Sequence, residues 1–426
     1  MTTSKASLCA ATKQLQASRG AILILLLAVL YNAFLAFINS HGFRLNPGHV
    51  MISEAAILFL ACCYILIKST NLSEHWRSFV FVYIIFVLFF WSILMNQNVY
   101  IKAVRDMIIM PVFVLLGCLA VEKDLIRMMR YLTAVLAAFM VLEGWFTNIY
   151  VSIFQPALYY ANTRGVQELS TDSSGLFRNS LGFSGRFTFG IFDTHRLSSL
   201  LLEQVSLANF SMVLGLFLIT FWDKLRRPDR IFFAGSVLFI ILSNNTRTGT
   251  LVNLIFIVGY FVFPVLPKRL HLLYIPMLML ISFAIFYNPH FHSSMATDDV
   301  SGRVGLTVNK LSELDLSTFF VGKLNSVTGV LDSGYLYLLY SQTGFGLIAY
   351  WIYTSLIVPS DDPNTKRFAN GLSIYIALNL LIGAGIFTIK TAGPLWFIAG
   401  YLIKQASNKT IIGSPNVKND PHSVRA

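Results

Sequence analysis

Long apolar runs follow one another along nearly the whole chain, separated mostly by short polar gaps. A helix that crosses a bilayer needs about 20 mostly apolar residues, and its backbone polar groups must be bonded within the segment. The runs therefore predict an all-α polytopic membrane protein with about twelve transmembrane helices. The predicted spans are 20–39, 50–67, 78–95, 103–121, 128–150, 197–222, 231–243, 249–266, 271–288, 331–358, 369–388 and 391–403.

The composition agrees with a membrane setting. Charged residues make up 12% of the chain and hydrophobic residues 55%, whereas a soluble domain has about 25% charged residues. The short gaps favour one transmembrane domain over residues 1–406, followed by a polar cytoplasmic tail at 407–426. The four cysteines have no metal-ligand spacing, so neither a disulfide framework nor a cysteine metal site is expected.

The basic residues predict the orientation. Clusters of Lys and Arg occupy every second connection, the pattern of cytoplasmic loops in membrane proteins. Both termini are therefore expected in the cytoplasm. This pattern accounts for most of the net charge of +12, and because no basic stretch forms a phosphate-facing surface, nucleic acid is not an expected partner.

Two long connections, at about 151–196 and 289–330, are expected on the periplasmic side. Loops of this length in a compact bundle are usually functional or disordered. The periplasmic face also receives basic residues that the topology signal would normally keep out, and an ionisable residue at membrane depth is a candidate for a functional site. These residues are Arg44, Lys102, Arg105, Arg164, Arg178, Arg186, Arg196, Arg247, Arg303 and Lys390.

Two interpretations of these charges remain open. Arg196 and Glu203 are seven residues apart, which is close to two turns, so on a continuous helix they would share a face. Such a pair, or Arg105 with Asp106, could neutralise its own charge inside the bundle. Alternatively, the carboxylates could orient guanidinium groups that bind an anionic substrate. Guanidinium groups bind phosphate oxygens in bidentate fashion, which favours a phosphate-bearing substrate.

Four stretches, taken in order, resemble elements of the bacterial O-antigen and exopolysaccharide polymerases, the Wzy group. These are "RLSSLLLEQVSLANF" from Arg196, "SNNTRTGTLVNLI" from Ser243, "SGRVGLTVNKLSELD" from Ser301 and "LDSGYLYLLYSQTGFG" from Leu331. The resemblance covers about residues 150–358. The related O-antigen ligases usually carry a histidine near the position of Asp332. None stands there in this chain, which favours a polymerase over a ligase.

The resemblance implies a metal-independent, GT-C-like membrane glycosyltransferase without a cofactor. Such enzymes join oligosaccharide repeats carried on undecaprenyl diphosphate, at the periplasmic face of the inner membrane. A flippase and a chain-length co-polymerase are the partners it implies. It assigns the catalytic positions to Arg196, Arg247, Arg303, Glu203 and Asp332. Substrate binding is assigned to Arg105, Arg186, His195, Thr248 and Tyr335.

Several alternatives stay open at this point. Asp332 or Glu203 is the candidate general base, and Glu203 has a structural role as its other interpretation. A ligase and a lipid-glycan transporter are the alternative functions. A transporter typically has broken helices around a site at the membrane midplane, whereas the ionisable residues here gather on one side.

Overall fold

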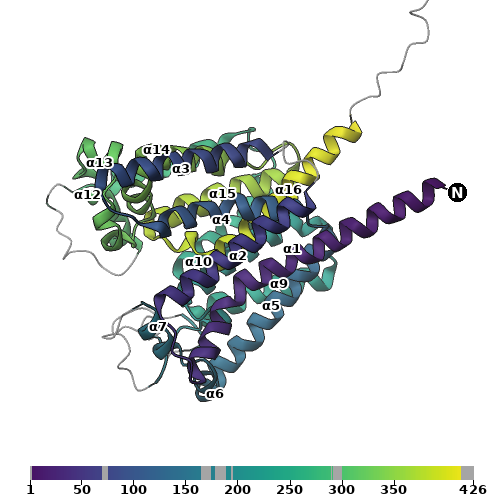
Figure 1. The fold of residues 1–426 in the computed structure, drawn as a ribbon, viewed down its shortest axis with the longest axis horizontal. Coiled ribbons are helices and arrows are strands. Elements are labelled where there is room, and N and C mark those ends of the chain that lie inside the picture. Colours follow the sequence, from purple (N-terminus) through teal and green to yellow (C-terminus); the bar gives the residue numbers. More distant parts are fainter. Residues whose placement is uncertain are drawn as a thin grey trace, which may run out of the picture.

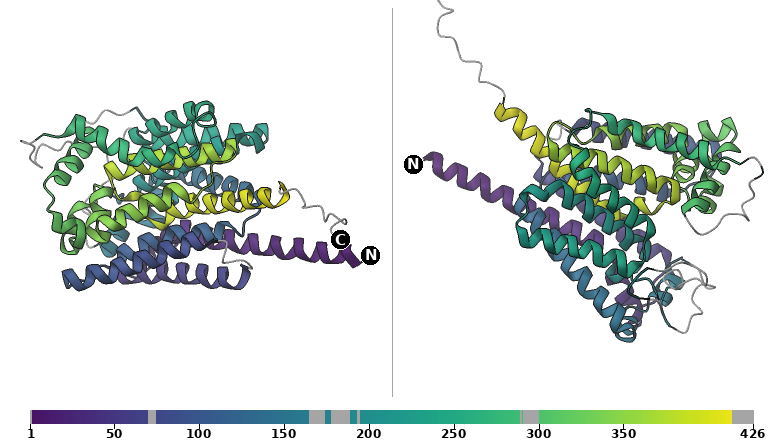
Figure 2. Two further views of the ribbon diagram at one scale, coloured as in Figure 1. Left: turned by 90° about the horizontal axis from the view of Figure 1, so that it is seen from above. Right: turned by 180° about the vertical axis from the view of Figure 1, so that it is seen from behind.

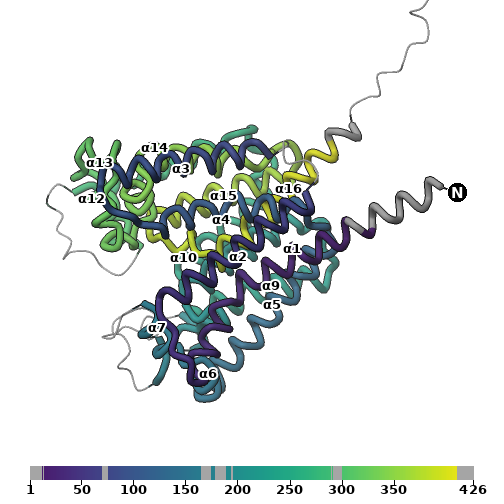
Figure 3. Tube along the Cα trace, viewed as in Figure 1, coloured from purple at the N-terminus to yellow at the C-terminus, as the bar shows by residue number. Residues whose placement is uncertain are grey.

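The computed structural model describes residues 2–69, 75–164, 174–177, 189–192, 195–288, 290 and 300–413, most of which are coloured in the tube of Figure 3. Most of the described chain is helical, and twelve of its helices overlap the twelve predicted spans one by one. They are α1 (Thr2–Ser40), α2 (Pro47–Lys68), α3 (Trp76–Asn96), α4 (Ile101–Gly117), α5 (Glu122–Trp145), α8 (Gln204–Phe221), α9 (Arg227–Asn244), α10 (Arg247–Val262), α11 (Tyr274–Phe286), α14 (Gly334–Leu356), α15 (Pro363–Ile382) and α16 (Ile389–Gly413).

Shorter helices occupy the connections. Four are α-helices: α6 (Thr147–Phe154), α7 (Pro156–Arg164), α12 (Val300–Ser312) and α13 (Leu316–Val321). Five are 3₁₀ turns: η4 (Ser199–Leu201), η5 (Trp222–Lys224), η6 (Leu270–Leu273), η8 (Leu324–Val330) and η9 (Gly385–Phe387). The two long connections therefore contain helices of their own in their described parts.

Five helices are long and apolar enough to cross a membrane, and they indicate a helical membrane protein. The five segments are Gln14–Ser40, Pro47–Lys68, Trp76–Asn96, Glu122–Trp145 and Gln204–Lys224. The other seven of the twelve helices are shorter, less apolar or more charged than these five. The count of twelve crossings and the GT-C-like fold stay predictions.

The helices form one bundle with distinct ends. The described beginning of α1 and the end of α16 project at one end, whereas α6, α7, α12 and α13 lie at the opposite end (Figure 1). Seen from above, the yellow-green α15 and α16 run between the blue helices near the amino terminus and the teal helices of the middle of the chain (Figure 2). α8 packs against α9, α10, α15 and α16, and 89% of its span is buried.

Glycines let α4 and α16 cross closely in the middle of the bundle. A Cβ at Gly117 would lie 2.1 Å from the carbonyl oxygen of Phe397, and one at Gly400 would lie 1.9 Å from that of Val114. Small residues permit such close approach of two helix backbones, and dispersion contacts between helices are a main source of stability where no water is present to be released. A larger residue at either glycine would force the two helices apart.

The expected span at 197–222 needs a correction. The α-helix begins only at Gln204, because the chain before it turns through η4 and passes through left-handed conformations at Ser199 (φ +52°) and Leu202 (φ +59°). Glu203 is the extended residue that precedes α8. The prediction that Arg196 and Glu203 share a helical face is therefore wrong.

Candidate functional site

The segment 195–203, which leads into α8, is the centre of a polar layer at the end of the bundle that holds α6 and α7. Glu143 of α5 is fully buried and accepts hydrogen bonds from the backbone N–H groups of Ser198 (2.8 Å) and Ser199 (2.6 Å) and from the Ser198 hydroxyl (2.8 Å). Tyr150 donates to the carbonyl oxygen of Ser199 at 2.8 Å. These bonds satisfy backbone groups that a continuous helix would have paired, so the irregular backbone is tolerated inside the protein.

Asn244, the last residue of α9, ties the same segment to the α9–α10 connection. Its side-chain amide donates to the carbonyl oxygens of Leu197 (2.6 Å) and Gln204 (2.9 Å). The guanidinium of Arg196 donates to the carbonyl oxygen of Asn244 at 2.8 Å and to its Oδ1 at 3.3 Å. Arg196 is therefore held beside the connection that leads to Arg247.

Arg247 is the first residue of α10, and Thr248 follows it. The hydroxyl of Thr246 accepts the backbone N–H of Gly249 at 3.1 Å, which is the side-chain cap that starts the helix. Arg247 and Thr248 are half-buried. Because the first backbone N–H groups of a helix favour negative charge nearby, this helix start adds to the positive potential of the two arginines.

Glu203 lies between two cations. Its carboxylate is 3.1 Å from the guanidinium of Arg164, at the end of α7, and 3.0 Å from the Nζ of Lys390, in the first turn of α16. The Ser206 hydroxyl donates to it at 3.0 Å. Burial alone would raise the pKa of Glu203, but the two cations outweigh burial and hold this pKa well below its usual range. Glu203 is ionised at any physiological pH.

Lys390 also fixes the segment before α8. Its Nζ donates to the carbonyl oxygen of Leu201 at 2.9 Å, and its side chain is 2% exposed. Arg164 is stacked over Tyr160, with 4.4 Å between the guanidinium carbon and the ring centroid. The carboxylate, the ammonium and the guanidinium thus join α7, α8 and α16 at one point.

A second charged group lies on α2 and α4. Arg105 donates to Asp106 at 2.6 Å and also contacts Glu54. Tyr337, near the start of α14, donates to Asp106 at 2.6 Å, and Tyr31 of α1 donates to Glu54. The predicted pairing of Arg105 with Asp106 is confirmed, and Glu54 is a further partner.

Tyr31 links the two charged groups. It donates to Glu54 of the second group, and its helix, α1, packs against α7, which ends at Arg164 of the first group. Both groups therefore belong to one polar layer, which reaches across α1, α2, α4, α7, α8, α14 and α16.

Arg303 adjoins this layer from α12. It donates to the carbonyl oxygen of Ile382, the last residue of α15, at 3.4 Å. Gly385, three residues after Ile382, packs closely against α8. A Cβ atom added at Gly385 would lie 3.1 Å from the side chain of Val205. Arg196, Arg247 and Arg303 come from three separate parts of the chain, and each belongs to or bonds an element that borders α8: Arg196 bonds the end of α9, Arg247 begins α10, and Arg303 bonds the end of α15.

The other predicted site residues have different surroundings. Asp332 is exposed on the turn before α14, whereas Tyr335 is 2% exposed and donates its hydroxyl to the carbonyl oxygen of Ile275 at 3.2 Å. His195 is buried, its ring bonds the backbone of Glu143, and burial lowers its pKa. Arg186 lies outside the described residues.

Sequence reasoning missed two carboxylates and one amide that position the layer. Glu54 and Glu143 each interrupt an apolar run, in "MISEAAILF" and "FMVLEGWF". An ionisable residue inside a transmembrane segment is a signal that the sequence offered. Asn244 had no comparable signal, because its bonds reach residues 40 and 47 positions away.

The described residues contain no group of three or more His, Cys, Asp or Glu side chains placed to hold a metal ion. What the layer offers instead is a set of guanidinium and ammonium groups, whose chemistry suits oxyanions. A scan against protein-family models and searches of curated proteins and of solved structures find no match to this chain.

Proposed function

We propose that the chain is a polysaccharide polymerase of the bacterial inner membrane, acting at the periplasmic face with both termini in the cytoplasm. Its substrates would be oligosaccharide repeats carried on undecaprenyl diphosphate. The observation that supports this proposal is the placement of Arg196, Arg247 and Arg303 on or against three elements that border α8. A diphosphate needs cations to hold its charge, and guanidinium groups supply them at every physiological pH.

In the proposed reaction, a sugar hydroxyl of the incoming repeat attacks the anomeric carbon of the growing chain. The new glycosidic bond forms from the hydroxyl oxygen to that carbon. The bond from the carbon to the diphosphate oxygen breaks, and undecaprenyl diphosphate leaves with the electron pair. The three arginines stabilise the negative charge that develops on the leaving group, because their positions are set before the reaction begins.

The proton of the attacking hydroxyl passes to a carboxylate, and the structure favours Asp332 over Glu203 for this step. Glu203 is held ionised by Arg164 and Lys390, and a carboxylate with such a low pKa is a weak base. Asp332 is exposed on the turn that precedes α14. We therefore assign Asp332 as the general base and Glu203 as a positioning residue that fixes the start of α8.

Replacing each of the three arginines by alanine tests the proposal. Loss of one preorganised electrostatic contact costs about 2–4 kcal/mol at a transition state, or roughly a hundredfold or more in rate. Cells with Arg196→Ala, Arg247→Ala or Arg303→Ala should accumulate single repeats on undecaprenyl diphosphate at the periplasmic face. Mass spectrometry of extracted lipid-linked glycans measures this, and an impermeant glycosidase reports the face. Arg44→Ala is the matched control, because Arg44 is exposed and donates only to Asn162 among the bonds described here.

The same measurement distinguishes the alternative functions. A ligase defect would leave long polymer on the lipid carrier, and a flippase defect would leave single repeats at the cytoplasmic face. Long lipid-linked polymer in all three variants would contradict the polymerase assignment. A chain-length co-polymerase and a flippase are the protein partners that the proposed reaction requires.

A further inference from the structure

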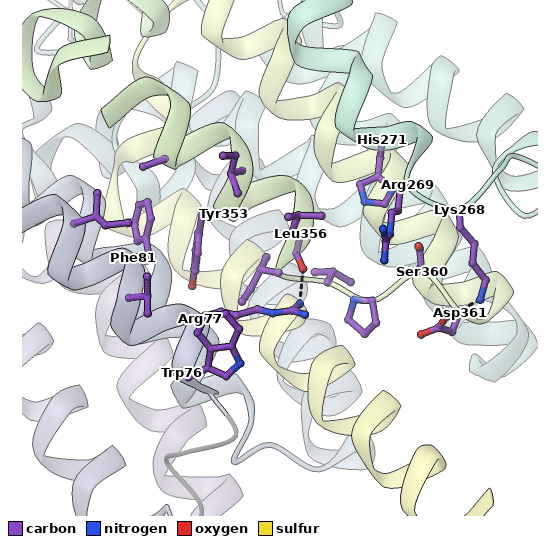
Figure 4. A pocket seen from close by; sticks show the side chains of 17 residues that line it. Trp76, Arg77, Phe81, Lys268, Arg269, His271, Tyr353, Leu356, Ser360 and Asp361 are labelled. Atoms are coloured by element: carbon purple, nitrogen blue, oxygen red, sulfur yellow. Dashed lines mark hydrogen bonds and ion pairs between the residues drawn. The ribbon is translucent and has the colours of Figure 1, made fainter. Parts of the chain in front are cut away.

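A cavity of about 660 Å³ lies at the end of the bundle opposite the polar layer. It is bounded by the beginning of α3, by η6, by the end of α14 and by the connection that follows α14 (Figure 4). The far end of α3 marks the other side of the molecule, because Asn96 there donates to the carbonyl oxygen of Val321 in α13 at 3.0 Å. The cavity therefore has no part in the candidate site.

One wall of the cavity is apolar and continues along the surface of the bundle. Val80 and Phe81 of α3 and Ile352 and Tyr353 of α14 line it, and the rings of Phe81 and Tyr353 stack at 4.2 Å. Beyond the cavity, α14 exposes Ile348, and exposed apolar residues also follow along α3. The apolar wall thus opens onto a surface that the hydrocarbon chains of a bilayer would cover.

The rim of the cavity is basic. Arg77 of α3 donates to the carbonyl oxygen of Leu356 at 2.9 Å, which holds its guanidinium beside the opening (Figure 4). Arg269, just before η6, extends toward the connection that holds Ser360 (Figure 4). Lys268 is paired with the nearby carboxylate of Asp361 at 2.9 Å. The lining therefore carries an excess of positive charge from its two arginines.

A buried polar atom in the lining also points to a ligand. His271 is 2% exposed and lines the cavity, and its Nδ1 has no hydrogen-bond partner among the described residues. Because a buried polar atom without a partner is costly, an occupant with a hydrogen-bonding group would stabilise this side chain.

We propose that this cavity binds the headgroup of an anionic phospholipid. Arg77 and Arg269 hold the phosphate, His271 bonds a polar group of the headgroup, and an acyl chain lies along the apolar surfaces of α3 and α14. A free anion would not need the apolar wall, and a neutral lipid would not need the two arginines. Basic pockets between transmembrane helices are known sites for such headgroups.

The general rule for basic residues at cytoplasmic helix ends explains charge on this side, but it does not require charges to converge on a cavity. The test must therefore separate specific binding from a merely basic surface. Purified full-length protein in detergent is titrated with phosphatidylglycerol, with phosphatidylcholine or with glycerol phosphate, and bound ligand is counted by native mass spectrometry. We expect saturable binding of one phosphatidylglycerol, with much weaker binding of phosphatidylcholine.

Two variants remove different halves of the site. Arg77→Ala with Arg269→Ala should weaken phosphatidylglycerol binding about thirtyfold, since each basic residue near a membrane surface contributes about fivefold. Val80→Trp keeps every cation, fills the apolar wall and should also weaken binding. The matched control is Arg226→Ala with Arg227→Ala, because this pair is exposed at the start of α9 and lies outside the cavity. Its binding should stay within about twofold of the parent protein.

Each other outcome overturns the proposal. Unchanged binding in the cavity arginine variant would show that the arginines do not hold the lipid. Equal weakening in the control would show nonspecific attraction to a basic face. Competition by glycerol phosphate at equal concentration would identify a free-phosphate site instead. These measurements need no polymerase activity, so their failure is distinct from failure of the proposed function.

Discussion

The ion pair of Glu203 and Lys390, which Arg164 joins with a partly exposed side chain, leads to a prediction about stability. Lys390 is 2% exposed and its Nζ is 3.0 Å from the carboxylate. At an effective dielectric constant of about 20, two unit charges at this separation attract each other by about 5.5 kcal/mol. Part of this energy is lost, because both ions give up their hydration. We therefore expect a net coupling energy between Glu203 and Lys390 of about 2–4 kcal/mol.

A double-mutant cycle measures this energy. Glu203→Gln leaves the Lys390 ammonium buried without its anion, and Lys390→Met leaves the carboxylate with Arg164 alone. Each single change should destabilise the protein by about 3–5 kcal/mol, because breaking a buried pair leaves an uncompensated charge. The double variant should lose less than the sum of the two, by the coupling energy.

The assay is equilibrium unfolding of the purified protein in mixed micelles, followed by the loss of helicity. The control cycle uses Lys268→Met and Asp361→Asn, a pair with nearly the same separation of 2.9 Å but with side chains 64% and 69% exposed. Its coupling energy should be at most about 1 kcal/mol, because water screens exposed pairs. A coupling energy for Glu203 and Lys390 no larger than that of the control would refute the reasoning.

Three further predictions concern function, pH and topology. Arg247→Lys should lose most polymerising activity, as is also expected of Arg247→Ala, because a point charge cannot replace a bidentate fork on a diphosphate. Normal polymer at normal protein abundance would show that Arg247 contributes only its charge. Burial lowers the pKa of His195. The folded protein therefore loses stability as the pH falls below about 6.5, the pKa of histidine in the unfolded chain, because the unfolded chain takes up the proton more readily. The melting temperature should fall less between pH 7.5 and 5.5 in His195→Gln than in the parent protein. In a cysteine-free background, Ser312→Cys should react with an impermeant thiol reagent in intact spheroplasts, and Ser407→Cys should not. The reverse labelling pattern would show that the predicted orientation in the membrane is wrong.

The positions of the helices followed from the sequence because they depend on local composition. Each apolar run of sufficient length became a helix, and even the short predicted segment 231–243 lies within α9. Helix ends were less predictable. The predicted span 128–150 is divided at Phe146, where α5 ends and α6 begins, because the backbone there departs from helical geometry.

The entry to α8 shows what local composition does not contain. Four of the six residues from Leu197 to Leu202 are leucine, and spacing alone placed Arg196 and Glu203 on one face. The actual conformation depends on bonds from Glu143, Asn244 and Lys390, which lie between 40 and 189 positions away in the sequence. A single sequence shows where polar residues interrupt apolar runs, but it does not show which of these residues belong to the layer or which of them meet.

The balance of charge separates the roles of the arginines within the layer. Arg105 contacts both Glu54 and Asp106, so this group is acidic overall and is poorly suited to bind a further anion. The described bonds of Arg196 to α9 and of Arg303 to α15 are made to oxygens of Asn244 and Ile382. Such bonds fix the directions of the two guanidinium groups, and a preorganised site for a diphosphate needs fixed cations. The two carboxylates favour a bundle-stabilising role for Arg105, whereas the proposed function assigns substrate binding to the positions around the start of α8.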